Sequence, residues 1–217
     1  MENIVQNQEI TNARIGPYLI GPGDNNINGI ICINLINRPE RRQKFMERWK
    51  DYPYQFFTAT PHTNPVRGCF ESHVSCIKYA KEQGWKNVLI LEDDAMIVKN
   101  LNDVPIFPDG WEMVYLGGLC IHIKDWSQLN NNYVSGHVFA CHAYIVNSSI
   151  FDEILTKSET STKPIDAFFS DQIQGHHNTY MIKISHIVQE AGWSDIENKQ
   201  KWENFHWPVV GERWHTP

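Results

Sequence analysis

The chain has 217 residues, of which 41% are hydrophobic and 20% charged, and its formal net charge is −6. This length can bury one full core, and the composition is that of a globular domain, which excludes the disordered and fibrous classes. The negative charge argues against broad binding to nucleic acids or anionic membranes, because no block of basic residues occurs outside Arg38 to Arg48. We therefore expect small molecules or neutral polymers as partners.

Five cysteines are scattered along the chain without a C-x-x-C pair. An odd number in apolar surroundings favours free, buried thiols in a reducing compartment over disulfides or a zinc site. The N-terminal residues have neither the basic start nor the apolar core of a signal peptide, and no stretch approaches the roughly 20 apolar residues of a membrane span. The sequence therefore predicts a cytoplasmic protein without an integral membrane segment.

Three segments are predicted from composition. Residues 1–28 are rich in Asn, Gln and Gly and are interpreted as a loose polar arm or an added edge element. Residues 29–196 alternate between strand and helix patterns and form the main domain. Residues 197–217 continue a tryptophan-rich stretch that we expect to pack on that domain, since covering a core is the commoner use of such aromatic residues.

The first strand is expected over residues 29–36, and Asn37-Arg38-Pro39-Glu40 follows it directly. These residues predict a helix with Asn37 as its N-cap and Pro39 in its first turn. A helix that opens from a strand presents backbone N–H groups and the positive end of its dipole at the edge of the sheet. Arg38 and Arg41 add positive charge there, so this edge suits a nucleotide.

A second strand is expected over residues 54–58, and apolar spacing predicts a helix over residues 68–81. The helical period places His73 on or beside the buried face, where a lone histidine is more often a core residue than a ligand. Cys69 and Cys76 lie too far apart along a helix to form a disulfide, so we interpret both as packing residues.

The central strand is expected over residues 88–95, which read Val-Leu-Ile-Leu-Glu-Asp-Asp-Ala. Its apolar run predicts burial on both faces, and its carboxyl end is where ligands bind in open α/β sheets. Adjacent carboxylates repel one another, so packing gives no reason for Glu92, Asp93 and Asp94, whereas a divalent cation does. A turn with a solvated acidic tip is the alternative interpretation.

Further strands are expected over residues 111–116, 133–146 (as one or two strands) and 180–189. The alternation of strands and helices predicts an α/β fold with a mostly parallel central sheet flanked by helices.

A short helix is expected to begin near Pro164. In it Ile165, Phe169 and Ile173 form one apolar stripe, while Asp166 and Asp171 project to opposite sides. Only one of these two acids can therefore face a given pocket.

Several motifs occur in a fixed order between about residue 30 and residue 196. They are Ile33-Asn34-Leu35 with Arg38-Pro39-Glu40-Arg41-Arg42, Gly68-Cys69 with Ser72-His73, Val88 to Ala95, His142-Ala143-Tyr144-Ile145-Val146, Pro164-Ile165-Asp166, and Gln189 with Ser194-Asp195-Ile196. This series resembles glycosyltransferase family 25, which includes bacterial lipooligosaccharide galactosyltransferases and the galactosyltransferase domains that act on collagen hydroxylysine. Ordered motifs are more specific together than any one alone.

The resemblance implies a GT-A fold, a UDP-sugar donor and Mn²⁺ or Mg²⁺. It implies that Asp94 binds the metal directly and that Glu92 is a further ligand, because a hard, oxygen-ligated cation neutralises the leaving diphosphate. The residues that it implies around the nucleotide are Asn34, Arg38, Ser72, His73, Glu92 and Asp93.

The resemblance also implies transfer of a hexose, galactose or glucose, to a hydroxyl group of a glycan or protein acceptor with inversion at the anomeric carbon. Asp166 is the candidate catalytic base. Ile36 and Asn37 stand where the family usually has an acid and a base. Two alternatives remain open: a non-catalytic member of the family that binds a sugar or a protein, and a metal-dependent phosphohydrolase.

Overall fold

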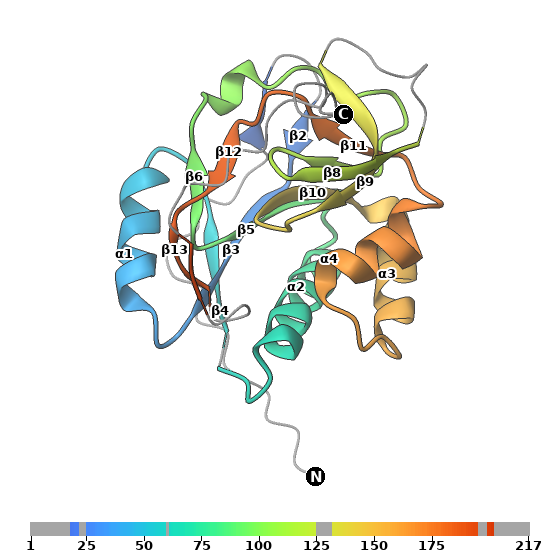
Figure 1. The fold of residues 1–217 in the computed structure, drawn as a ribbon. Helices are drawn as coiled ribbons and strands as arrows, with labels where there is room; N and C mark the ends of the chain where they lie inside the picture. Colours follow the sequence, from blue (N-terminus) through green and yellow to red (C-terminus); the bar gives the residue numbers. More distant parts are fainter. Residues whose placement is uncertain (1–17, 22–24, 60, 125–131, 195–198, 202–217) are drawn as a thin grey trace, which may run out of the picture.

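A large sheet with helices on both faces forms the centre of the computed structural model, which describes residues 18–21, 25–59, 61–124, 132–194 and 199–201 (Figure 1). The strands of this sheet are β3 (Gly29–Leu35), β4 (Gln55–Ala59), β5 (Asn87–Glu92), β7 (Met113–Tyr115), β8 (Leu119–Ile123), β9 (Tyr133–Phe139), β10 (Ala143–Asn147) and β11 (Thr179–Ile182). The helices are α1 (Pro39–Arg48), α2 (Pro65–Glu82), α3 (Phe151–Ser158) and α4 (Ile165–Phe168), the 3-10 helices η1 (Leu101–Asp103) and η3 (Ser148–Ile150), and the π-helix η4 (Phe169–Gln174).

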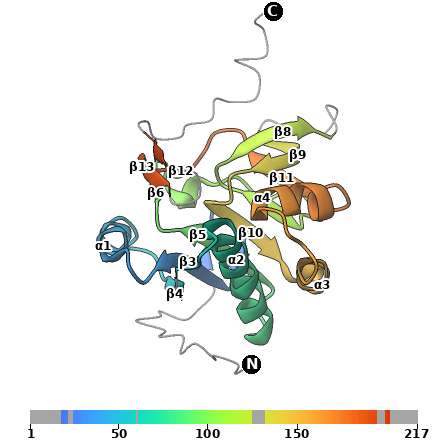
Figure 2. The ribbon, with the colours of Figure 1, turned by 60° about the horizontal axis from the view of Figure 1, so that its bottom comes forward.

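The strand order of the sheet is β4-β3-β5-β10-β7-β11-β9-β8. Strands β4, β3 and β5 are parallel neighbours, and β7 and β11 are parallel to each other. Strands β10 and β9 run against their neighbours on either side, so the other six strands share one direction. The predicted α/β class, with a largely parallel sheet between helices, is confirmed. Helix α1 covers one face and helices α2, α3 and α4 cover the other (Figure 2).

Strand β5 lies inside the sheet and is buried on both faces, as its apolar run predicts. Val88 and Ile90 belong to the core on the α2 side, whereas Leu89 and Leu91 belong to the core on the α1 side. Successive side chains of a strand point to opposite faces. Glu92, the last residue of β5, therefore continues the series that faces α2.

The structure corrects the strand expected over residues 180–189. β11 ends at Ile182, and the chain then forms β12 (Ile187–Gln189), which pairs antiparallel with β6 (Ala95–Ile97) outside the main sheet. The backbone N–H of His186 donates to the carbonyl of Leu116, which anchors the crossing between the two strands. Local periodicity shows that both pieces are strands but not that they have different partners. The β6–β12 ribbon lies beside α1 in Figure 1.

Two predicted helix starts also need correction. Helix α1 has Arg38 rather than Asn37 at its N-cap, without a side-chain cap, because a turn first joins the N–H of Arg38 to the carbonyl of Leu35. Helix α2 begins before residue 68, since the side chain of Asn64 accepts hydrogen bonds from two backbone N–H groups of the first turn.

Part of the predicted polar arm belongs to the packed structure. Strands β1 (Tyr18–Leu19) and β2 (Asn26–Ile27) pair with each other, and Ile20 and Ile27 are fully buried in the core on the α1 side. Near the other end, β13 (Gly192–Ser194) pairs with β14 (Lys199–Lys201). Residues 1–17 and 202–217, with most of the predicted tryptophan-rich segment, lie outside the described residues. Among the described helices, none has the length and apolar character needed to cross a bilayer.

Candidate functional site

Three consecutive acids follow the buried part of β5, and the strand geometry sends them to different surroundings. Glu92 faces helix α2, as its place in the strand requires, whereas Asp93 turns toward helix α1 and the end of β3. Asp94 follows in the turn that leads into β6. The predicted acidic strand end is thus a junction between α1, α2 and the β6–β12 ribbon.

Both carboxylate oxygens of Asp93 accept hydrogen bonds from neighbouring side chains. Nδ2 of Asn34 donates to its Oδ2 at 2.8 Å, and Nη1 of Arg41 donates to its Oδ1 at 2.9 Å. Asn34 is buried at the end of β3 and also donates to the carbonyl of Arg38 at 3.2 Å. Burial raises the pKa of Asp93, while the charge of Arg41 and the hydrogen bond from Asn34 counter this effect. Asp93 therefore fixes the loop between β3 and α1 against the end of β5.

Asp94 has one satisfied and one unsatisfied carboxylate oxygen. Nε2 of Gln189 on β12 donates to Oδ2 at 3.1 Å, and Nη1 of Arg41 lies 3.7 Å from the same oxygen. Oδ1 is buried and has no hydrogen-bond partner among the residues that the structure describes. Burial and then the charges of Glu92 and Asp93 raise the pKa of Asp94 to about 8. A hard cation is a suitable partner for a buried carboxylate oxygen of this kind, so Asp94 fits the predicted metal.

Glu92 faces a thiol and an imidazole from the first half of helix α2. Its Oε1 lies 3.4 Å from Nε2 of His73, and one ligand atom of each of Cys69, His73 and Glu92 lies within 4.8 Å of the other two. Nδ1 of His73 lies 2.9 Å from the hydroxyl of Tyr144 on β10. Burial and then the charge of Glu92 raise the pKa of the Cys69 thiol well above its usual value. His73 thus lies on the buried face, as predicted, and it also faces an acid of the site.

Asp166 lies on the same side of the sheet as Glu92. After burial, its negative charge is the largest cause that raises the pKa of the Cys141 thiol. Oδ1 of Asp166 accepts from the backbone N–H of Ala167 at 2.8 Å. Asp171 instead pairs with Lys163 at 2.6 Å on the surface, so the two acids diverge as the helical pattern predicts.

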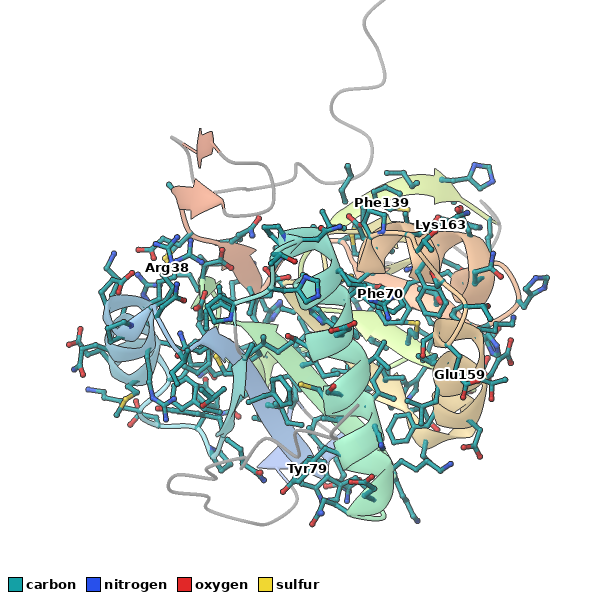
Figure 3. All side chains as sticks on the ribbon, turned by 90° about the horizontal axis from the view of Figure 1, so that it is seen from below. Arg38, Phe70, Tyr79, Phe139, Glu159 and Lys163 are labelled. Carbon is teal, nitrogen blue, oxygen red and sulfur yellow. The ribbon has the colours of Figure 1, made fainter. Side chains whose placement is uncertain are left out.

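Ser72 and Arg38 have local partners. The Ser72 hydroxyl donates to the carbonyl of Gly68 at 2.7 Å within α2. Arg38 lies 3.6 Å from Glu40, and Figure 3 places it beside α1, on the opposite side of the sheet from Phe70 of α2. Ile36, just after the end of β3, is 65% exposed. The predicted residues therefore lie around one end of the sheet, in two groups. On the α1 side are Asn34, Arg38 and Asp93. On the α2 side are Ser72, His73, Glu92 and Asp166.

No protein-family model matches the sequence, and no curated protein matches it at a significant level. Solved structures of similar fold include A197 from STIV, with 11% identity, a TM-score of 0.43 and coverage of 85% of this chain and 98% of that chain. A glycosyltransferase involved in glycosylation of the major capsid of PBCV-1 has 12% identity, a TM-score of 0.41 and coverage of 65% and 73%. A nucleoside-diphosphate-sugar pyrophosphorylase from Vibrio cholerae RC9 has 14% identity, a TM-score of 0.41 and coverage of 73% and 75%. These similarities concern the backbone fold alone.

Three residues contact the site acids although no sequence motif predicts these contacts. The sequence predicts that Arg41 adds positive charge at the nucleotide edge and that Gln189 belongs to an ordered motif, and in the structure both contact Asp94. Cys69 was interpreted as packing, although it lies next to His73 and Glu92. A signal for Cys69 is present in the sequence, because residues four apart on a helix share a face. No local pattern indicates the contact of Gln189, which depends on the pairing of β12 with β6.

Proposed function

We propose that the protein is a metal-dependent glycosyltransferase of family 25 that transfers galactose or glucose from a UDP-sugar to a hydroxyl group of a glycan or protein. The observation that carries this proposal is the buried Oδ1 of Asp94, which has no hydrogen-bond partner among the described residues and lies just after the carboxyl end of β5. The other oxygen of this carboxylate, Oδ2, lies 3.7 Å from Nη1 of Arg41. Ligands of open α/β sheets bind at this end of the strands.

Asp94 and Glu92 would hold Mn²⁺ or Mg²⁺, with carboxylate oxygens as the ligands that these ions prefer. When bound, the ion supplies positive charge that neutralises the diphosphate as it leaves. Arg41 acts on the same leaving group, and Asp93 positions Arg41 through the contact of 2.9 Å. Asn34, Arg38, Ser72 and His73 complete the surroundings of the nucleotide.

Asp166 is the proposed catalytic base. The oxygen of the acceptor hydroxyl attacks the anomeric carbon, the bond between that carbon and the UDP oxygen breaks, and the carboxylate of Asp166 takes the hydroxyl proton. A single displacement of this kind inverts the anomeric configuration. Asp166 lies on the α2 side of the sheet, where its charge acts on Cys69 and Cys141, and this position supports its role as the base.

The test is release of UDP from a panel of UDP-sugars, with and without Mn²⁺ or Mg²⁺, in the presence of candidate acceptors. Asp166→Asn is expected to lower turnover at least about 100-fold, the usual contribution of a general base. Thermal stabilisation by UDP-sugar and metal should persist, because Asn keeps the shape of the residue. Asp171→Asn is the matched control, since Asp171 lies on the next turn and pairs with Lys163 at the surface.

Unchanged turnover in Asp166→Asn would remove Asp166 from the mechanism. If the wild-type protein gains no thermal stability from millimolar UDP with Mn²⁺, the metal-dependent transferase is wrong and the non-catalytic binding protein is favoured.

A further inference from the structure

A thiol, an imidazole and a carboxylate converge at the first half of helix α2. Cys69 and His73 are four residues apart and therefore project from the same face of the helix. Glu92 reaches them from the end of β5, and one ligand atom of each residue lies within 4.8 Å of the other two. The three groups come from two elements that pack together in the core, so the helix and the strand fix their relative positions.

His73 has a buried nitrogen that lacks a hydrogen-bond partner. The residue is fully buried, and its Nε2 makes no hydrogen bond to any described residue although it faces Oε1 of Glu92 at 3.4 Å. Its other nitrogen, Nδ1, lies 2.9 Å from the Tyr144 hydroxyl. If Nδ1–H donates to that hydroxyl, Nε2 presents a lone pair toward a carboxylate. Two lone pairs at this distance repel each other, and a cation between them removes the repulsion.

The distances suit a tetrahedral metal ion. Two ligand atoms that each lie about 2.1 Å from Zn²⁺ are about 3.4 Å apart in a tetrahedron. The measured separation of His73 Nε2 and Glu92 Oε1 is 3.4 Å. The Cys69 thiol lies within 4.8 Å of both other ligand atoms, which makes it the third candidate ligand. Histidines that bind metals also usually donate their second N–H to a fixed partner, the place that Tyr144 holds here.

We propose that Cys69, His73 and Glu92 form a Zn²⁺ site beside the acidic turn. A thiolate with an imidazole favours Zn²⁺ over Mn²⁺ and Mg²⁺, which prefer oxygen ligands. Three protein ligands leave a fourth position for water or a small ligand. The inference goes beyond the proposed transferase, because it requires neither a nucleotide nor the metal on Asp94. Glu92 is a proposed ligand of both metal sites. When it binds Zn²⁺ together with Cys69 and His73, its carboxylate is not available to the metal ion on Asp94.

Cobalt substitution tests the site in the whole chain of 217 residues. The chain is stripped with a chelator and titrated with Co²⁺ under reducing conditions. We expect one thiolate-bound Co²⁺ per chain, with near-ultraviolet charge-transfer absorption and the strong visible bands of tetrahedral Co²⁺, and Zn²⁺ should displace it. A Co²⁺ ion held by Asp94 has only oxygen ligands and gives no thiolate band, so failure of the proposed transferase and failure of the zinc site are separate results.

Two variants assign the thiolate. Cys69→Ser should remove the charge-transfer band and lower Zn²⁺ affinity at least tenfold. Cys120→Ser should keep both, because Cys120 is a buried free thiol on β8 outside this cluster. A thiolate band that survives in Cys69→Ser overturns the proposal, as does its absence from the wild-type protein. The second result leaves His73 and Glu92 as a histidine–carboxylate pair without a metal ion.

A measurement on the wild-type protein covers the case in which Cys69→Ser does not fold. Alkylation of each cysteine is followed by peptide mass spectrometry with and without Zn²⁺. Zn²⁺ should slow alkylation of Cys69 at least tenfold and leave the rate at Cys120 unchanged. Equal rates at Cys69 in the two conditions overturn the proposal.

Discussion

Nη1 of Arg41 lies 2.9 Å from Oδ1 of Asp93 and 3.7 Å from Oδ2 of Asp94, so one guanidinium on α1 spans two of the three adjacent acids. The side chain of Asp93 is only 8% exposed, which makes the loss of its partner costly. Arg41 thus has a structural role in the free protein as well as its proposed role toward the leaving diphosphate.

Arg41→Met should lower the free energy of unfolding by about 1.5–3 kcal/mol, the range for a hydrogen bond to a charged group. Urea denaturation measures the change. Lys44→Met is the matched control on the same helix, because Lys44 is 56% exposed and its pair with Glu190 spans 3.6 Å. Its expected cost is below about 1 kcal/mol. Equal losses in the two variants would show that Arg41 does not hold Asp93 in solution.

Asp94→Asn should stabilise the metal-free protein and abolish its response to Mn²⁺ with UDP. The substitution replaces a buried acid, whose charged form is opposed by burial and by the charges of Glu92 and Asp93, with a neutral amide, and it also removes the proposed metal ligand. A gain of about 1 kcal/mol would raise Tm by about 2–4 °C for a chain of this size.

Thermal unfolding with and without ligands measures both parts of this prediction. Asp51→Asn, at an exposed turn after α1, should change neither the Tm of the metal-free protein nor its stabilisation by Mn²⁺ with UDP. A variant of Asp94 that still gains stability from Mn²⁺ and UDP would contradict the assignment of Asp94 as a metal ligand.

Tyr144→Phe should weaken Zn²⁺ binding about 10- to 100-fold, the usual effect of removing a partner that orients a metal ligand. The variant loses the hydroxyl 2.9 Å from Nδ1 of His73 and keeps the buried ring. Tyr133→Phe is the control, because that hydroxyl donates to the carbonyl of Pro105 at 2.6 Å, away from the cluster. Competition with a chromophoric chelator gives both affinities. The same affinity in the two variants would remove Tyr144 from the site.

Gly117→Ala should destabilise the fold strongly, by about 2 kcal/mol or more, because a side chain there overpacks the core. A Cβ atom at residue 117 would lie 1.9 Å from the carbonyl oxygen of Ile187 and 3.0 Å from Nε2 of His142. The absence of a side chain at Gly117 therefore allows β12 to pack closely against the end of β7.

Gly175→Ala provides the comparison. Its backbone has φ −60° and ψ −30°, and the nearest atom to a new Cβ is 3.8 Å away. Alanine in such a place should stabilise the fold by about 0.4–1 kcal/mol through the unfolded state. Chemical denaturation of both variants checks the pair, and similar losses in both would contradict the packing at residue 117.

The sequence by itself determined the elements whose patterns are local. The apolar run before Glu92 predicted a strand buried on both faces, and the helical period placed His73 on the buried face of α2. The stripe of Ile165, Phe169 and Ile173 is buried as predicted. Such patterns follow from the backbone periods of 2 and 3.6 residues, which each segment carries within itself.

Only the tertiary structure decided what each acid contacts. Gln189 reaches Asp94 across 95 positions of the sequence, and Tyr144 reaches His73 across 71. These contacts depend on the strand order and on the departure of β12 from the main sheet, which no local period encodes. Burial of neighbouring segments brings distant residues together. Asp93 and Asp94 therefore share Arg41, Asp94 also contacts Gln189, and Glu92 faces the thiol–imidazole pair.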